Sequence, residues 1–151
     1  MPAPRPLRST VLELQEAIPH AEELAAHERL LDVVAHRAGD ALTSDFGAQD
    51  VVLLFNILHH FSQEQAESIV RRAFDALTPG GTVAIWEIEA PGAQAPASAG
   101  DGVSLFFRLT SSAAAYHGDQ YALWLHNAGF RRVHVTRPAM APGKVLVTAR
   151  R

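Results

Sequence analysis

Two adjacent histidines and an asparagine follow a run of apolar residues in the segment VVLLFNILHHF, residues 51–61. The run at 51–55 has the composition of a buried strand, so Asn56, His59 and His60 come just past its carboxyl end. An imidazole titrates near neutral pH and can take up a proton as a general base. The segment therefore predicts either a site that removes a proton or histidines that only hydrogen-bond at a strand end.

A metal site is the other chemistry that histidines suggest, and the spacing argues against it. The side chains of adjacent residues such as His59 and His60 diverge, and no HxH or HxxxH companion stands nearby. His20 and His27 lie seven residues apart in a predicted helix, which fits a solvated face. The chain has no cysteine, which excludes thiolate zinc sites and disulfides. We therefore expect no bound metal.

The composition is that of an ordinary globular protein. The 151 residues are 48% hydrophobic and 19% charged, enough for one hydrophobic core. A formal charge of −3 gives no electrostatic basis for binding nucleic acid. No apolar run reaches the ~18 residues of a membrane-spanning helix, and the first ten residues lack a secretory signal. We expect a cytoplasmic protein with neither nucleic-acid nor membrane partners.

The elements that must position these histidines alternate between strand and helix. The pattern predicts strands at 9–14, 33–38, 50–55 and 82–88, with helices at 16–31 and 62–77. Ser62 and Gln65 form a capping box for the second helix, and the TPGG turn at 78–81 ends it. The composition of residues 90–102 is typical of a loop, and 105–115 is compatible with a helix. A helix at 119–128 closes on Gly129, and strands at 132–136 and 144–149 form a final pair.

This alternation indicates an α/β fold with a right-handed, mostly parallel sheet, Rossmann-like, with helices on both faces. A C-terminal antiparallel strand pair completes the sheet. Residues 1–8 are expected to be irregular or disordered, and 9–151 to form one domain. Ligands of such sheets bind outside the carboxyl ends of the strands. His59 and His60 therefore lie at the edge where a site is expected.

The order of several motifs resembles the class I S-adenosylmethionine-dependent methyltransferases, and in particular the small-molecule O-methyltransferases. These motifs, in chain order, are VLEL, AGDAL, DVVLLFNILHHF, RRAFDALTPGGTVAIWEIE and WLHNAGF. The resemblance runs from about residue 10 to residue 150, and LHHF and LTPGG at this spacing make it specific. It implies that residues 9–151 form a partial methyltransferase domain.

The resemblance assigns five residues to the cofactor, S-adenosylmethionine. Glu13 matches the acidic residue that holds the ribose hydroxyls, a role that suits a carboxylate because it can accept from both. Asp40 matches the carboxylate near the adenine amino group, with Ala41 beside it. Phe55 and Asn56 end the strand that floors the cofactor site.

The resemblance also assigns a catalytic residue. His59 matches the histidine that deprotonates the acceptor hydroxyl in plant-type O-methyltransferases, whereas His60 is expected to be structural. The implied reaction is methyl transfer to the hydroxyl of a small acceptor, aromatic or polyketide-like, of the kind found in secondary metabolism. Because the transfer is an in-line displacement, catalysis consists of positioning and the removal of one proton.

The chain departs from the family at its beginning. The family's first strand and glycine-rich loop are missing, since no glycine precedes Ser9. Such a loop lets the backbone approach the methionine part of the cofactor, so cofactor binding is expected to be weak or lost in the isolated chain. The alternative function is a catalytically inactive module that serves interaction or assembly. A nicotinamide-dependent enzyme is disfavoured because the glycine fingerprint is absent.

The missing strand also has a structural consequence. The family's strand order is 3-2-1-4-5-7-6, which places the first strand between residues 10–14 and 50–55. An open edge recruits any available strand, so we expect the chain to self-associate as a homo-oligomer. The alternative is a shortened sheet in which residues 11–14 pair directly with residues 51–55.

Overall fold

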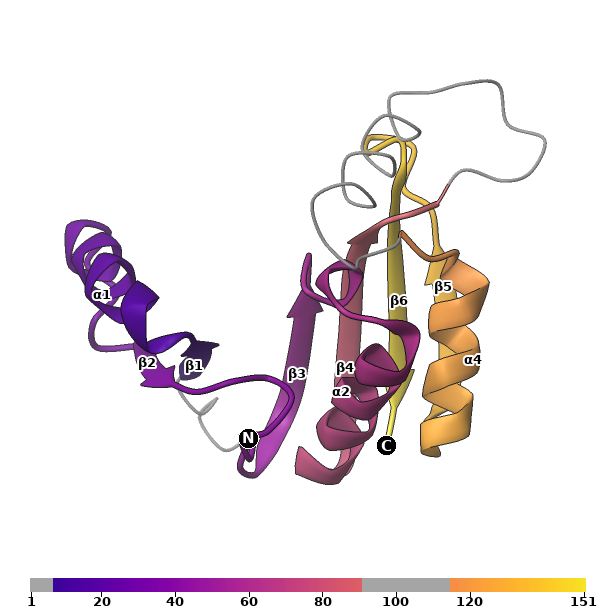
Figure 1. Ribbon diagram of the computed structural model, residues 1–151, viewed down its shortest axis with the longest axis horizontal. Helices are drawn as coiled ribbons and strands as arrows, with labels where there is room; N and C mark the ends of the chain where they lie inside the picture. Colours follow the sequence, from indigo (N-terminus) through magenta and orange to yellow (C-terminus); the bar gives the residue numbers. More distant parts are fainter. Residues whose placement is uncertain (1–6, 91–114) are drawn as a thin grey trace, which may run out of the picture. The chain divides into compact units, whose positions relative to one another are not determined.

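The computed structural model describes residues 7–90 and 115–151 (Figure 1). The chain divides into two structural units, Met1–Ser44 and Asp45–Arg151, and each is described by itself. The expected irregular start at residues 1–6, the loop at 91–102 and the helix at 105–114 lie outside the described residues.

The first unit is a small βαβ arrangement. Its elements are β1 (Ser9–Glu13), the 3-10 turn η1 (Gln15–Ala17), α1 (Ile18–His27) and β2 (Val34–Ala38). The two strands pair in parallel, from Ser9 opposite Val34 to Glu13 opposite Ala38. The helix ends four residues earlier than predicted, and Arg29 takes a left-handed φ of 57° just after it. Ala25 is the only hydrophobic residue that is buried among those described in this unit.

The second unit is a four-stranded sheet with two helices. Its elements are β3 (Gln49–Phe55), the 3-10 turn η2 (Leu58–His60), α2 (Gln63–Ala76), β4 (Leu77–Ile88), α4 (Gly118–Ala128), β5 (Arg131–Thr136) and β6 (Lys144–Arg150). The strand order is β3-β4-β6-β5, with β3 parallel to β4 and the β4–β6 and β6–β5 pairs antiparallel (Figure 1).

The strand orders confirm the fold class predicted from the sequence. The described strands form two sheets, in the orders β2-β1 and β3-β4-β6-β5. In the predicted order 3-2-1-4-5-7-6, the sheet β2-β1 corresponds to strands 3-2, and the sheet β3-β4-β6-β5 corresponds to strands 4-5-7-6. The early pairs are parallel and the closing pair is antiparallel, as expected.

Helix α2 begins and packs as its sequence predicts. The Ser62 hydroxyl accepts from the Gln65 backbone N–H, and the Gln65 side chain accepts from the Ser62 N–H, which completes the capping box. The face toward the sheet is buried and consists of Ala66, Ile69, Val70, Ala73 and Ala76. Arg71 is exposed, as a solvated face requires.

The start of β4 differs from the prediction. The strand begins at Leu77 instead of residue 82, so the TPGG segment is part of the strand. Gly80 takes a left-handed φ of 82°, and the register shifts between Gln49 and Val51 on the neighbouring strand. A Cβ on Gly81 would lie 3.0 Å from the Asp50 carbonyl oxygen, so glycine allows the strands to approach here. The turn signal therefore marks an irregularity within the strand.

The core of the second unit lies between the sheet and its helices. In Figure 1, α2 and α4 both cover the same face of the sheet. On that face Val52, Leu54, Val83 and Ile85 are buried. The apolar run of β3 agrees with a strand that packs its side chains under helices, at Val52 and Leu54. The opposite face of β3 is exposed, at Val51, Leu53 and Phe55.

The helices of the described residues are short. None of them is long and apolar enough to cross a membrane.

Candidate functional site

The candidate site begins where β3 and β4 end side by side. Phe55 pairs with Trp86, and the next backbone N–H, that of Asn56, donates to the Trp86 carbonyl at 2.8 Å. Asn56 then takes a left-handed φ of 50°, which turns the chain out of the strand and into η2. A left-handed non-glycine residue is uncommon, and asparagine tolerates it better than most. The Asn56 side chain accepts a hydrogen bond from Lys144 Nζ at 2.8 Å.

Glu87, near the end of β4, anchors this turn. Its side chain is fully buried, and its Oε1 accepts from the backbone N–H groups of Ile57 at 2.8 Å and Leu58 at 2.7 Å. Its Oε2 lies 2.6 Å from His59 Nδ1. A buried carboxylate is costly unless it is hydrogen-bonded, and these three bonds satisfy it. Glu87 therefore fixes both the backbone of η2 and the orientation of His59.

The contact with Glu87 determines the tautomer that we assign to His59. A carboxylate only accepts hydrogen bonds, so the proton of the imidazole lies on Nδ1. The ring lone pair then lies on Nε2, which is the atom that can take up a proton. His59 is 3% exposed and belongs to a buried pair, not to the solvent-facing surface. The imidazole of His59 is therefore held in a fixed orientation by Glu87.

His60 has a different environment. It is exposed, and its ring centroid lies 4.1 Å from that of His59 with the planes tilted by 45°. Partial burial lowers the pKa of His60, the neighbouring His59 lowers it further, and Glu87 opposes both. The two histidines therefore differ in exposure, since His59 is buried against Glu87 and His60 faces outward.

A second cluster lies beside the first and joins the ends of three elements. Glu89 Oε1 accepts from the Gly118 N–H at 2.8 Å, and Arg137 donates to both carboxylate oxygens at 2.7 Å. Burial alone would raise the pKa of Glu89, but the bonds from Arg137 and Gly118 outweigh it and hold the pKa below its usual value. The cluster therefore ties β4 to the start of α4 and the segment after β5.

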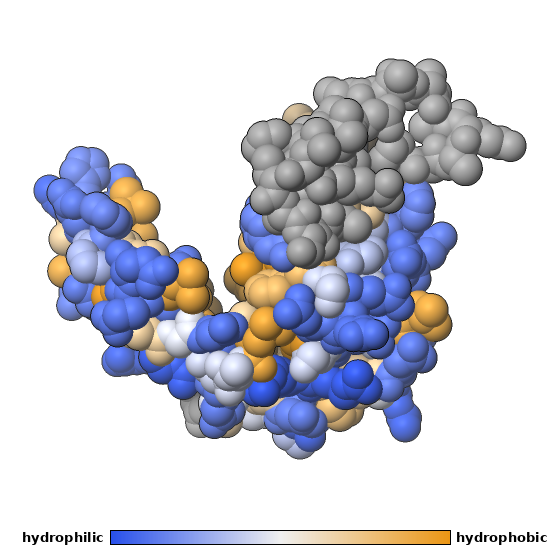
Figure 2. Space-filling view, in the orientation of Figure 1, coloured by the Kyte–Doolittle hydropathy of each residue, from blue (hydrophilic) through white to orange (hydrophobic). Residues whose placement is uncertain are grey.

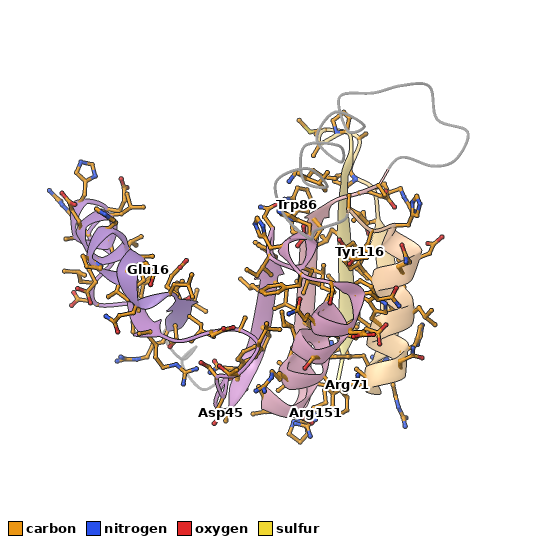
Figure 3. All side chains as sticks on the ribbon, in the orientation of Figure 1. Glu16, Asp45, Arg71, Trp86, Tyr116 and Arg151 are labelled. Atoms are coloured by element: carbon orange, nitrogen blue, oxygen red, sulfur yellow. The ribbon has the colours of Figure 1, made fainter. Side chains whose placement is uncertain are left out.

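Aromatic side chains form the wall beside these clusters. The Tyr116 hydroxyl donates to the Phe61 carbonyl at 3.0 Å, and its ring packs edge-on against Trp124 at 4.8 Å. In Figure 3, Trp86 and Tyr116 lie toward the carboxyl ends of the parallel strands, while Arg71 and Arg151 lie at the opposite end. The chemistry-bearing residues of this unit thus gather at one edge of the sheet.

The first unit holds the other predicted cofactor residues. Glu13 ends β1, and its carbonyl accepts from the Gly39 N–H at 2.8 Å, just after β2. Asp40 follows, and its Oδ1 accepts from the Leu42 N–H at 2.7 Å. Parallel pairing thus brings Glu13 and Asp40 to the same edge of this sheet, with Ala41 next in the chain. Phe55, Asn56 and His59 belong to the second unit.

The turn that carries Asp40 requires a glycine. A Cβ on Gly39 would lie 2.4 Å from Ser44 Oγ and 2.7 Å from Leu12 Cδ1. The Asp40 N–H donates to the same Ser44 hydroxyl at 3.0 Å. The turn is therefore tight and presents the Asp40 carboxylate at a fixed place beside the end of β1.

Among residues 7–90 and 115–151, no group of three His, Asp or Glu side chains could hold a metal ion. Glu87 was missed by the sequence reasoning, which treated TVAIWEI only as a strand. The sequence feature that could have indicated Glu87 is an acidic residue within an apolar run, at the carboxyl end of the strand next to β3.

Comparisons with known proteins show which family this chain belongs to. A family model described as O-methyltransferase domain matches residues 5–131. The tetracenomycin polyketide synthesis 8-O-methyl transferase TcmO of Streptomyces glaucescens is 32% identical over 131 residues, which are 86% of this chain and 39% of that protein. The 3-hydroxy-5-methyl-1-naphthoate 3-O-methyltransferase of Streptomyces sahachiroi is 32% identical over 91% of this chain and 40% of its own length.

One solved structure is similar to this chain in both fold and sequence. The S-adenosylmethionine-dependent methyltransferase SibL, in its apo form, superposes with a TM-score of 0.84 at 27% identity. The match covers 96% of this chain and 43% of SibL. The chain therefore spans about two-fifths of the length of the relatives that it matches.

Proposed function

Because the chain belongs to the O-methyltransferase domain family, we propose that it takes part in methyl transfer from S-adenosylmethionine to the hydroxyl of a small molecule. The observation that carries this proposal is the buried pair of His59 and Glu87 at the carboxyl edge of the sheet. O-methylation needs one base placed beside the acceptor hydroxyl, and a firmly oriented imidazole can supply it.

The proposed step follows from the bonds of His59. As the acceptor oxygen forms its new bond to carbon, Nε2 of His59 takes the hydroxyl proton. The imidazolium that results is stabilised by Glu87, which stays hydrogen-bonded to Nδ1. When bound, S-adenosylmethionine would supply the methyl group, and its carbon–sulfur bond would break as the bond to oxygen forms, so that the neutral thioether S-adenosylhomocysteine leaves with the bonding electrons. Since Glu87 also binds two backbone N–H groups of η2, the base is held in place without a change of conformation.

The cofactor residues are part of the same proposal. Glu13 accepts from the ribose hydroxyls, Asp40 lies near the adenine amino group with Ala41 beside it, and Phe55 and Asn56 contribute the end of β3. The residues fit the adenosine part of the cofactor, because the carboxylates of Glu13 and Asp40 stand at the same edge of one strand pair. The tight turn at Gly39 keeps the backbone close to them. Carboxylates are the acceptors that hydroxyl and amino groups require.

The acceptor and setting are also proposed. The names of the two Streptomyces relatives indicate aromatic and polyketide-derived acceptors, which supports a small hydroxylated acceptor from secondary metabolism. The absence of cysteine supports a reducing, cytoplasmic setting. The exposed apolar face of β3 supports a homo-oligomer.

The test of the base compares His59→Ala with His60→Ala in a form of the protein that transfers methyl groups. Removal of a general base typically lowers turnover by roughly 10²–10⁴-fold, and this is the effect expected for His59. The control, His60→Ala, should change turnover only a few-fold, because His60 is exposed. Small and equal effects of the two substitutions would reject the assignment.

A second candidate function is a catalytically inactive methyltransferase-like module that serves interaction or assembly. The observation that favours it is the exposed β3 face, since large apolar side chains outside a core are typical of contact surfaces. The two candidates differ in cofactor binding and methyl transfer, both of which the inactive module lacks.

A further inference from the structure

The turn that carries His59 is held at its two ends by different parts of the chain. Glu87, on β4, binds two backbone N–H groups at the start of the turn and the His59 ring beside them. The end of the turn is the Phe61 carbonyl, which accepts a hydrogen bond from the Tyr116 hydroxyl at 3.0 Å. The two residues of this bond are 55 positions apart in the sequence, so only the tertiary fold brings them together.

The Phe61 carbonyl needs a partner from outside because the helix that follows does not pair it. Ser62 is the N-cap of α2, and its own carbonyl accepts the first bond of the helix, from the Ala66 N–H at 2.9 Å. The Gln65 N–H, four residues after Phe61, donates instead to the Ser62 hydroxyl. A backbone carbonyl that is turned away from water is costly without a hydrogen bond. Tyr116 supplies this bond.

Tyr116 is itself held in a fixed place. It is 7% exposed, and its ring packs edge-on against Tyr121 at 6.0 Å and Trp124 at 4.8 Å. Its backbone forms a bridge with Glu89, just beyond the end of β4. Burial raises the pKa of the Tyr116 hydroxyl, so near neutral pH the phenol keeps the proton that it donates. The donor therefore reaches the turn from a rigid support.

This aromatic support is internal to the second unit. Tyr121 and Trp124 are buried on the inner side of α4, and Figure 2 shows a mostly hydrophilic surface over this helix. In Figure 3, Tyr116 lies near the start of α4, toward the carboxyl ends of the parallel strands. Tyr116 therefore connects the hydrophobic core of the unit to the turn that carries the proposed base.

We propose that Tyr116 is a positioning residue for His59, a role that rests on the function proposed above. Glu87 fixes the direction of the imidazole through Nδ1, but the place of the ring also depends on the backbone of the turn. Glu87 holds this backbone at its start and Tyr116 holds it at its end, so the two together prevent the turn from pivoting. A base must stand within hydrogen-bond reach of the proton that it takes, and a displacement of about 1 Å can lower the rate roughly 10²-fold.

Tyr116→Phe tests this role with little disturbance of the packing. The substitution removes only the hydroxyl and leaves the ring in its aromatic cluster, while the Phe61 carbonyl loses its donor. The matched control is Tyr121→Phe at the other of the two tyrosines of the chain. It makes the same chemical change in the same cluster, at a hydroxyl that does not bond the turn among the described residues.

The first measurement uses the chain itself and does not involve methyl transfer. Hydrogen exchange of the Phe61 amide, which donates to the Leu58 carbonyl at 3.2 Å, reports on the closing bond of the turn. In Tyr116→Phe this exchange should be at least about tenfold faster, because local opening becomes easier. The NMR signals of the His59 ring should shift or broaden in the same variant. Tyr121→Phe should leave both as they are in the parent.

The second measurement is a double-mutant cycle in a form of the protein that transfers methyl groups. Tyr116→Phe should lower turnover roughly 10–10²-fold, whereas Tyr121→Phe should change it only a few-fold. In a His59→Ala background, Tyr116→Phe should have almost no further effect, because a positioning residue acts through the group that it positions. A merely structural bond would lower turnover by the same factor in both backgrounds.

Three results would overturn the proposal. They are unchanged Phe61 exchange and His59 ring signals in Tyr116→Phe, equal effects of Tyr116→Phe and Tyr121→Phe, and equal factors in the two backgrounds of the cycle. Small and equal effects of His59→Ala and His60→Ala would reject the base itself and would overturn the role of Tyr116 with it. That failure is recognised from the histidine variants, so it is distinguished from a failure confined to Tyr116.

Discussion

At the scale of single residues, Glu87 carries more of the site's geometry than any other side chain. Its carboxylate holds two backbone N–H groups of η2 and the Nδ1 of His59 at the same time. This arrangement couples stability to chemistry, because the group that orients the proposed base also anchors the turn on which that base lies.

Glu87→Gln should therefore lower stability and disturb His59. An amide has one acceptor oxygen and places an NH2 group where the second carboxylate oxygen stood, so the three present bonds cannot all be kept in this buried site. The expected loss is about 1–3 kcal/mol in the free energy of unfolding, measured by urea denaturation. Nitrogen NMR of the imidazole should show that His59 no longer holds its proton on Nδ1 alone.

The matched control for this change is Glu67→Gln on α2, where the side chain accepts a bond from Gln63 near the surface. An amide oxygen can replace that acceptor, so the free energy of unfolding should stay within about 0.5 kcal/mol of the parent. Equal effects at positions 67 and 87 would contradict the central place given to Glu87.

The free energy of unfolding should depend on pH through Glu89. Hydrogen bonds from Arg137 and Gly118 hold the pKa of Glu89 below its ordinary value, although burial opposes them. A carboxyl with a lowered pKa in the folded state binds fewer protons there than in the unfolded chain. Its contribution to stability is present above the unfolded pKa and is lost as the pH falls through the folded pKa.

Arg137→Gln should remove part of this dependence. We expect the variant to lose stability near about pH 6, and its difference from the parent should shrink as the pH falls through the folded pKa of Glu89. Arg150→Gln serves as the control, because Arg150 donates to the neutral Gly80 carbonyl. The measurement is the urea midpoint across this pH range, and a parallel loss at all pH values in Arg137→Gln would contradict the argument.

At the scale of elements, helix α2 connects the site to the sheet. Two residues, Phe61 and Ser62, separate it from η2, and its apolar face packs against the strands. Its capping box satisfies backbone N–H groups that a helix leaves unpaired at its start. The first turn of the helix and the turn that carries His59 are thus fixed by adjacent sets of hydrogen bonds.

Ser62→Ala should lower the free energy of unfolding by about 1 kcal/mol, the usual cost of losing an N-cap side chain. Ser68→Ala makes the same chemical change in the middle of this helix, where alanine is the better helix former. It should be neutral or slightly stabilising. Thermal unfolding of the two variants checks the difference, and similar destabilisation by both would show that the cap is not the cause.

At the scale of the whole molecule, residues 1–151 taken alone predict weak cofactor binding. They carry the proposed adenosine-side residues Glu13 and Asp40, and they span about two-fifths of the length of the relatives that they match. We expect the isolated chain to bind S-adenosylmethionine weakly or not at all in calorimetric titration. A dissociation constant near 1 μM, which corresponds to about 8 kcal/mol, would contradict this expectation.

Much of the fold could be predicted from the sequence because the signals are local. The capping box at Ser62, the stop at Gly129 and the periodicity of α2 depend on residues within a few positions of one another. The placement of His59 past the end of β3 also follows from a local pattern, since strand and turn adjoin in the chain. Residue types and spacings determine such features before any tertiary contact forms.

Tertiary structure decided what depends on residues far apart in the chain. The bond between His59 and Glu87 joins positions 28 apart, and the bond between Asn56 and Lys144 joins positions 88 apart. The exposure of one face of β3 depends on which helices cover the sheet, and the apolar run VVLLF has the same composition whether one face or both are covered. Burial and long-range pairing are properties of the assembled sheet, so only the tertiary structure could pair Glu87 with His59 and show which face of β3 lies under helices α2 and α4.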